Sequence, residues 1–406
     1  MHTFFLRLAL LATITAAVSA DGETDPIADL DRLVESTSES EMPVYHIPQR
    51  FLGVVVGSEL FAATDGDLID PDASSPVTPI LMYGDRDLLG RSITLDVMTA
   101  GIFWQLRLGT RDLWGTGVAL GVAGEALIAD FGTRAFYDAS GRAVPRWESE
   151  FSSYAGSLHL DSALGPGVVA TSYEVRREVY SATSDTADGF VLPDDVRHRV
   201  DMTATLDLTN PIALGAAYDG FSLTVGGAVT TFAGFSTWGT TDFSHSAPSG
   251  PTITAEASAA YGRRIGRISN VSLEIAAFGG FNYYTRTLHA LGSPGVMAGS
   301  ALYVRGYPAD SVEAERGALA HVDLGREVLP EKLHLSLFSD TALVDVPDRL
   351  RESTAVLHAV GAHMSARFPW SMQLKVTYAH SVVSLDGDTD GGRHALTLLL
   401  TRFAHF

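Results

Sequence analysis

Strict alternation of apolar and polar residues is the feature that most restricts how this 406-residue chain can fold. In the stretch "VDMTATLDLT" (200–209), every second residue is apolar and the residues between are Asp or Thr. Successive side chains of a strand point to opposite faces, so the pattern predicts a strand with one apolar and one polar face. The pattern recurs along the chain, and no stretch shows sustained helical spacing.

The alternation predicts sixteen strands. They are expected near residues 51–62, 76–84, 92–107, 114–130, 149–161, 167–180, 197–209, 218–233, 251–262, 270–287, 297–305, 317–328, 332–345, 355–368, 371–384 and 394–406. The polar faces carry Thr, Ser, Gly, Asp and Ala, whereas a soluble sandwich or propeller would carry more Lys and Glu. The even strand count, with aromatic residues near strand ends, favours an all-β, transmembrane antiparallel β-barrel in the bacterial outer membrane.

Composition narrows the class of protein. Beyond the N-terminus no run of about 18 apolar residues occurs, which excludes a helical membrane protein, although 46% of the chain is apolar. The chain has no cysteine, so it is not a disulfide-stapled scaffold. Its net charge of −20 argues against nucleic acid as a partner. In hydrocarbon every backbone polar group must be paired, and a closed sheet meets that requirement.

The N-terminal residues divide into two short segments before the barrel. Residues 1–20 have a basic start, an apolar stretch and small residues before Asp21, which indicates a secretory signal peptide cleaved after Ala20. Residues 21–50 are predicted to be an acidic periplasmic linker or a short plug helix, and both alternatives stay open. Residues 51–406 are predicted to form the outer-membrane β-barrel, whose terminal Phe406 is expected to act as the insertion signal.

Two stretches near the C-terminus carry a resemblance to a known family. The stretch "YVRGYP" (303–308), followed by "ERGALAHVDLGREVLPEKLHLSLFSDTAL" (315–343), resembles the barrel end of the BamA-like superfamily of outer-membrane assembly and translocation proteins, which includes the two-partner-secretion transporters. In that superfamily a Val/Ile-Arg-Gly-Phe/Tyr motif lies on a long extracellular loop folded back into the lumen. Its arginine pairs with acidic residues on the inner wall of the next two strands.

The resemblance implies a lock between this loop and the wall. Its expected members are Arg305, Gly306 and Tyr307 on an inward-folded extracellular loop and Asp340, Asp323 and Phe338 on the wall. Strand parity agrees independently, because Asp323 faces the lumen if Val322 and Leu324 face lipid. The loop itself is expected at residues 306–316, between the eleventh and twelfth strands. Ala342 and Asp323 depart from the family, which has glycine and usually glutamate there.

The resemblance also implies the function. A barrel of this type moves protein or lipid across or into the outer membrane. Relatives usually carry periplasmic domains of ~75 residues that capture a substrate strand, whereas here only residues 21–50 precede the first strand. The expected partners are outer-membrane lipid and lipopolysaccharide, the insertion machinery during biogenesis, and a separate periplasmic or secreted protein substrate.

Two alternatives from other classes remain: a passive solute pore and, less favoured, a membrane-embedded lipid hydrolase. No Gly-x-Ser-x-Gly elbow, phosphate loop or His-Glu-x-x-His motif occurs, so we predict no enzyme activity and no cofactor. Residues 386–391, "DGDTDG", match half of a calcium loop, but Thr397 stands where a glutamate is needed, so no metal site is predicted.

Overall fold

The structure is a computed structural model that describes most of the barrel. The described residues are 50–63, 75–88, 93–101, 103–110, 113, 116–127, 133–134, 149–182, 186, 189–212, 217–240, 244–245, 248, 250–283, 289–291, 302–307, 312–346, 353–370, 372–385, 388–389 and 392–405. The predicted signal peptide, the linker up to residue 49 and Phe406 lie outside them. Among these residues, no helix is long and apolar enough to span a membrane.

Sixteen strands of the described chain form one closed antiparallel β-barrel. They are β1 (Arg50–Ala63), β2 (Ser75–Leu88), β3 (Ile93–Ala100), β4 (Phe103–Thr110), β5 (Val118–Leu127), β7 (Ser149–Leu164), β8 (Gly167–Ala182), β9 (Val196–Ile212), β10 (Ala217–Ala233), β13 (Thr252–Ile265), β14 (Ser269–Phe281), β17 (Arg316–Leu329), β18 (Leu333–Val346), β19 (Ser353–Phe368), β20 (Met372–Leu385) and β22 (Arg393–His405). Each pairs with the next along the chain, which confirms the predicted fold class and strand number.

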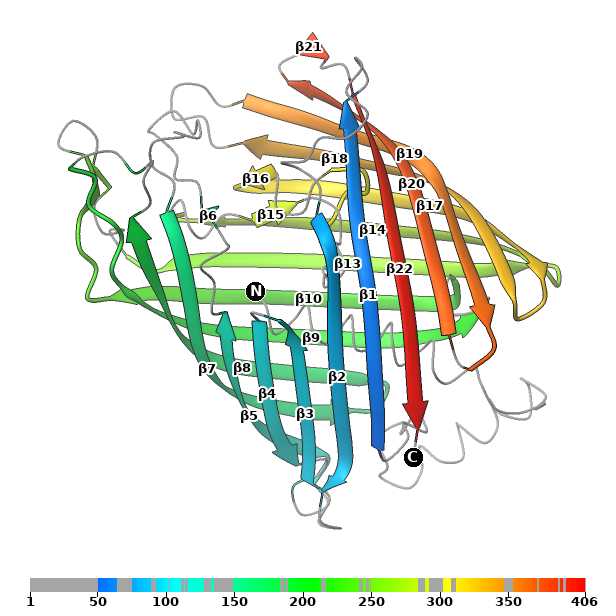
Figure 1. The fold of residues 1–406 in the computed structure, drawn as a ribbon, viewed down its shortest axis with the longest axis horizontal. Helices are drawn as coiled ribbons and strands as arrows, with labels where there is room; N and C mark the ends of the chain where they lie inside the picture. Colours follow the sequence, from blue (N-terminus) through cyan, green and yellow to red (C-terminus); the bar gives the residue numbers. More distant parts are fainter. Residues whose placement is uncertain are drawn as a thin grey trace.

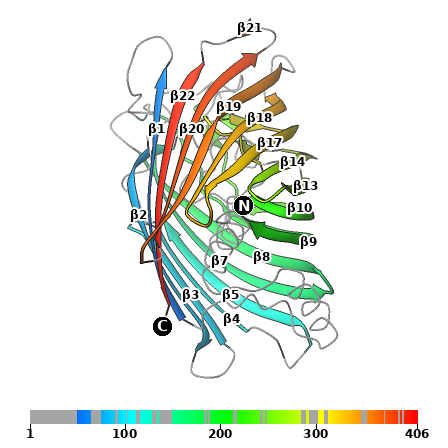
Figure 2. The same ribbon diagram turned by 90° about the vertical axis from the view of Figure 1, so that its right-hand side faces the viewer.

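The first and last strands close the barrel. β1 and β22 lie side by side (Figure 1), and their register runs from Phe51 opposite His405 to Ala63 opposite Arg393. Viewed from the side, the strands are steeply tilted and curve around the barrel (Figure 2). Closure pairs the strand edges with each other, so the sheet can lie in hydrocarbon without unpaired backbone groups.

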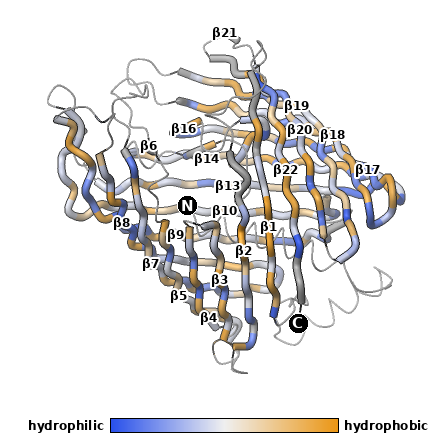
Figure 3. Tube along the Cα trace, viewed as in Figure 1, coloured by the Kyte–Doolittle hydropathy of each residue, from blue (hydrophilic) through white to orange (hydrophobic). Residues whose placement is uncertain are grey.

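The side chains of each strand alternate between an outer apolar face and an inner face. On β18, Leu335, Leu337 and Leu343 are exposed, whereas Phe338 and Asp340 are buried. Figure 3 shows the same alternation of hydrophobic and hydrophilic residues along many of the strands. Large exposed apolar side chains on one continuous face are typical of a barrel that meets lipid on its outside, and the barrel is therefore of the outer-membrane type.

The connections differ between the two ends of the barrel. At the end where β1 begins, every connection is short, from residues 165–166 to residues 111–117. At the other end lie the long connections 128–148, 183–195, 234–251 and 282–315. In outer-membrane barrels the short turns face the periplasm and the long connections face outside.

Two predicted strands were wrong, and the two errors cancel in the count. The predicted strand 92–107 is a hairpin of β3 and β4, because Gly101 with φ of 70° begins a two-residue turn, and the outward apolar residues change from odd positions such as Val97 on β3 to even positions such as Leu106 on β4. The predicted strand 297–305 is not a barrel strand: residues 302–304 have no regular secondary structure, and residues 297–301 lie outside the described part. The eleventh strand is therefore β14, and the connection to β17 begins at residue 282 rather than at 306.

Candidate functional site

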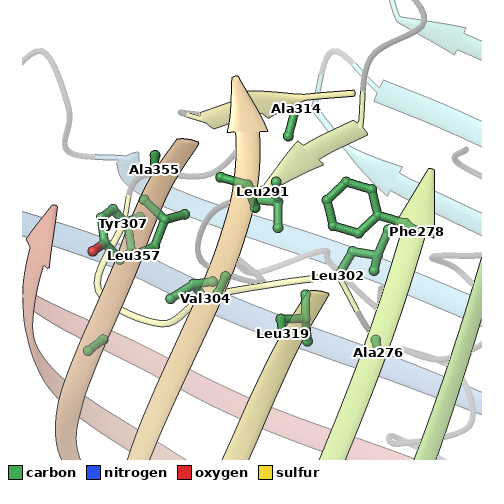
Figure 4. Packing of buried hydrophobic residues seen from close by; sticks show 13 residues of the cluster. Ala276, Phe278, Leu291, Leu302, Val304, Tyr307, Ala314, Leu319, Ala355 and Leu357 are labelled. Atoms are coloured by element: carbon green, nitrogen blue, oxygen red, sulfur yellow. The ribbon is translucent and has the colours of Figure 1, made fainter. Parts of the chain in front are cut away.

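A short segment of the connection between β14 and β17 lies against the inner face of the barrel wall. This inner segment, Leu302–Tyr307, buries Leu302, Val304 and Tyr307 in an apolar cluster with inward side chains of β14, β17, β18 and β19. In Figure 4 the inner segment runs across the strands of the wall, and Val304 and Tyr307 lie in the same cluster as Leu357. Leu302 and Val304 alternate with less buried residues because both pack on the wall. Their spacing therefore resembles that of a strand, although the segment is not a strand.

From this segment, the guanidinium of Arg305 makes a bidentate contact with the carboxylate of Asp340. Its Nε donates to Asp340 Oδ2 at 2.8 Å and its Nη2 to Oδ1 at 2.5 Å. The backbone N–H of Arg305 donates to the same Oδ2 at 3.0 Å. Asp340 is fully buried, so these three charge-assisted bonds are what makes a carboxylate tolerable at this place in the wall.

The same guanidinium makes a second bidentate contact, with the carboxylate of Asp323. Nη1 donates to Asp323 Oδ1 at 2.9 Å and Nη2 to Oδ2 at 3.1 Å. The predicted contact between Arg305 and Asp323 is therefore formed. The ring of Phe338 lies 3.7 Å from the guanidinium carbon, so a cation–π contact covers one face of the group. Four of the five guanidinium N–H groups are thus bonded to carboxylates of β17 and β18.

Two residues that the sequence analysis missed complete this cluster. His321 lies on β17 opposite Asp340, and its Nδ1 is 3.1 Å from Asp340 Oδ1. The ring of Tyr303 stacks on His321, with centroids 4.2 Å apart and planes 8° apart. His321 shares the parity of Asp323 along β17, and that signal in the sequence could have identified it as inward-facing.

Gly306 lets the chain turn directly against the wall. Its φ of 89° is in the left-handed region, which favours glycine. A Cβ at this position would lie 3.0 Å from Cβ of Ala379 and 3.1 Å from Cβ of Ser381 on β20. The hydroxyl of Ser381 donates to the carbonyl of Gly306 at 2.8 Å. Both the backbone conformation and the close approach therefore require glycine.

Tyr307 fixes the far end of the inner segment to the next two strands. Its hydroxyl donates to the carbonyl of Val382 at 2.5 Å and accepts the backbone N–H of His358 at 3.1 Å. Burial raises the pKa of Tyr307 to about 12, so the phenol keeps its proton for this contact. The segment is thus bonded to four consecutive strands, β17 to β20.

A second charged cluster lies on the opposite part of the inner wall, around Arg176 on β8. In this Arg176 cluster, Nη2 of Arg176 lies 2.7 Å from Glu125 Oε1, and Nε lies 3.0 Å from Glu174 Oε1. Nη1 of Arg176 donates to the hydroxyl of Ser153 at 2.9 Å. All of these side chains project inward from strands. Arg197, next to Arg176 in register, lies 3.6 Å from Glu174. No pattern in the sequence indicated this cluster.

The described residues thus bring together six of the predicted site residues: Arg305, Gly306, Tyr307, Asp323, Phe338 and Asp340. The remaining one, Phe406, lies outside the described part, as do residues 308–311 of the predicted loop. No group of three or more His, Cys, Asp or Glu residues that could hold a metal ion occurs in the described chain. The role of the six residues as a lock stays a prediction.

Comparisons with known proteins agree in fold. No family model matches the sequence, and no curated protein is similar to it. BamA from Haemophilus ducreyi lacking POTRA domains 1-3 superposes with a TM-score of 0.58 at 11% identity, over 96% of this chain and 81% of that chain. CdiB from Acinetobacter baumannii gives 0.54 at 10% identity, over 87% of this chain and 60% of that one. CdiB from Escherichia coli gives 0.52 at 12%, over 86% and 62%.

These likenesses confirm the resemblance at the level of fold. The chain forms a barrel similar to those of BamA and CdiB, and it spans about 60% of the length of the two CdiB chains. Together with the outward apolar face, this shows an outer-membrane barrel.

Proposed function

We propose that this barrel moves protein, or alternatively lipid, across or into the outer membrane, with Arg305 locking the inner segment to the wall. The bonds from Arg305 to both Asp323 and Asp340 are the observation that carries this proposal. The similarity to BamA and CdiB barrels supports the translocation class and argues for no particular cargo. The expected partners are outer-membrane lipid, lipopolysaccharide and a periplasmic or secreted protein.

The bonds of Arg305 to Asp323 and Asp340 are suited to holding the inner segment in one position on the wall. A buried arginine between two carboxylates gains little overall stability over apolar packing, whereas removing one partner leaves an unpaired buried charge. Such a pair specifies a position more than it adds stability. In a transport barrel, that position would keep the inner segment, Leu302–Tyr307, against the wall while the substrate passes.

A passive solute pore is the second candidate, and the Arg176 cluster favours it. Charged side chains project inward from β5, β8 and β9, and a polar interior is typical of pore-forming barrels. The third candidate, a lipid hydrolase, has no such supporting observation. We therefore propose no enzyme activity.

The proposal is tested by deleting the gene and comparing the outer membrane and culture medium with those of the parent strain. Loss of a few surface or secreted proteins, or of one lipid class, is expected. Wild type should restore it and Arg305→Ala should not, although Arg305→Ala reaches the membrane in equal amounts. The matched control is Arg177→Ala, because Arg177 forms an exposed pair with Asp194 that should matter little.

Two results would contradict the proposal. One is an unchanged surface, secretome and lipid composition with slower uptake of small solutes, which would favour the pore. The other is full complementation by Arg305→Ala, which would leave transport independent of the lock.

A further inference from the structure

Three histidines lie in a row on the outer face of three neighbouring strands. They are His358 on β19, His380 on β20 and His394 on β22. His380 lies opposite His394 in register, and their rings are 4.7 Å apart. His358 lies opposite Val382, two residues along β20 from His380.

Burial of the intervening residues shows that the row faces outward. Leu357 and Ala359 flank His358 and are buried on the inner face. Ala379 and Ser381 flank His380 in the same way, and Ala395, next to His394, is buried. Since side chains alternate along a strand, the three imidazoles point to the lipid side.

Hydroxyl groups orient two of the three rings. The hydroxyl of Tyr378, itself on the outer face, bonds Nδ1 of His394 at 2.7 Å, and the two rings stack with planes 21° apart. Thr341 Oγ1 bonds Nδ1 of His358 at 2.9 Å. With a hydroxyl donating to Nδ1, the ring proton sits on Nε2, which then offers an N–H donor away from the wall. The buried Nδ1 of His380 has no hydrogen-bond partner in the described chain.

The row lies toward the end of the barrel that carries the long connections. His394 is close to the start of β22, and His358 lies in the first half of β19. Farther from that end, most outward residues of the same strands are apolar, among them Val360 and Leu398, and Arg402 on β22 is the exception. The outward carboxylate nearer the strand ends, Asp345, is already bonded to Arg316 and Thr354. An anionic ligand would thus meet donors at the histidines and apolar surface beside them.

We propose that His358, His380 and His394, the last of them oriented by Tyr378, bind the phosphate-bearing head group of an outer-leaflet glycolipid. The phosphate oxygens accept from the Nε2 donors, and the acyl chains lie along the apolar residues of β19, β20 and β22. The row faces the bilayer, so a lipid reaches it by lateral diffusion while a free anion in water does not. The proposal is independent of the transported substrate.

Binding of diphosphoryl lipid A and of its dephosphorylated counterpart to the purified full-length barrel in detergent micelles tests this directly. The wild type is expected to prefer the diphosphoryl form. The triple variant His358→Gln/His380→Gln/His394→Gln should bind it at least about tenfold more weakly, since each lost bond to a charged group weakens binding by about that factor or more. Heat-modifiable gel mobility verifies that each variant is folded, and the single variants give the answer if the triple variant does not fold.

The matched control is His198→Gln. His198 bonds Tyr173 at 2.8 Å and the rings stack at 21°, as in the pair of Tyr378 and His394. This pair lies on β8 and β9, away from the histidine row, so His198→Gln should leave binding unchanged. Equal binding of both lipids, unchanged binding by the folded histidine variants, or an equal loss in His198→Gln would overturn the proposal. Displacement of the lipid by millimolar inorganic phosphate would assign the row to a free anion instead.

Discussion

Two arginines inside the barrel each bond two carboxylates, yet they hold different parts of the chain. Arg176 projects from β8, and its partners project from β5 and from β8 itself. Backbone ladders already fix these strands relative to one another. Arg305 belongs to a connection, and its partners lie on β17 and β18. The first cluster adds to a wall that exists without it, whereas the second joins a connection to that wall.

The difference teaches where an ion pair can control conformation. Backbone pairing around Arg176 persists when its side chain is lost, so the effect is one of stability. The inner segment has no strand ladder to the wall, and its position depends on Arg305, the Gly306 contact and Tyr307. We therefore expect Arg305 variants to move the segment and Arg176 variants to leave it in place.

Arg305→Ala is expected to have the largest effect on the inner segment. The substitution leaves the carboxylates of Asp323 and Asp340 without their partner, and breaking a buried pair costs about 3 to 5 kcal/mol. Arg305 is only 13% exposed and Asp340 is fully buried, so solvent relieves little of this cost. Protease sensitivity of residues 306–316 on intact cells and single-channel conductance should both rise, with the barrel still folded. Loop protection and conductance equal to wild type would refute the lock.

A double variant sharpens this result. Asp340→Asn should release the segment as Arg305→Ala does, and the combination of the two should add little, because partners in one network are not additive. Additive effects would mean that each residue acts through separate contacts.

Arg176→Ala is expected to lower barrel stability without releasing the segment. It leaves Glu125 and Glu174 unpaired on the inner wall, where Arg176 and Glu174 are each only 4% exposed, at a cost of about 3 kcal/mol. The midpoint of heat modification in gels should fall while protease protection of residues 306–316 stays at the wild-type level. Exposure of those residues in Arg176→Ala would erase the distinction between the two clusters.

Gly306→Ala is expected to have a smaller effect, confined to the inner segment. The left-handed backbone conformation costs a residue with a Cβ about 1 to 2 kcal/mol, and the added methyl meets Ala379 at 3.0 Å. Protease sensitivity of the segment should rise moderately. The control is Gly124→Ala on β5, where a Cβ would meet nothing within 4 Å and no change is expected. Equal behaviour of the two variants would mean that the close approach at Gly306 is wrong.

Sequence patterns predicted the barrel well because alternation reports directly which face meets lipid. They failed at two places. The turn between β3 and β4 has only two residues, and the outward apolar residues change there from odd positions such as Val97 to even positions such as Leu106, a change of phase that the strand prediction overlooked. Leu302 and Val304 alternate because they pack on the wall. Both errors are local, and they left the strand count unchanged.

The two charged clusters differ in how far the sequence could predict them. The family motif around Arg305 and the parity of Asp323 and Asp340 predicted these three residues as partners. Arg176 and Glu125 are far apart in the sequence and lie on β8 and β5, which are not adjacent in the barrel. Their contact depends on register and side-chain reach across an intervening strand, which a single sequence does not encode in a readable pattern.

The accessibility of a cysteine at position 304 is the most direct test of the central claim that the inner segment lies against the wall. Val304 is fully buried in the apolar cluster, and the chain has no cysteine of its own. We predict that Val304→Cys in intact cells reacts slowly with a membrane-impermeant maleimide, that adding Arg305→Ala makes it react quickly, and that adding Arg176→Ala leaves it slow. Fast labelling of Val304→Cys in a folded barrel that keeps Arg305 would contradict the account.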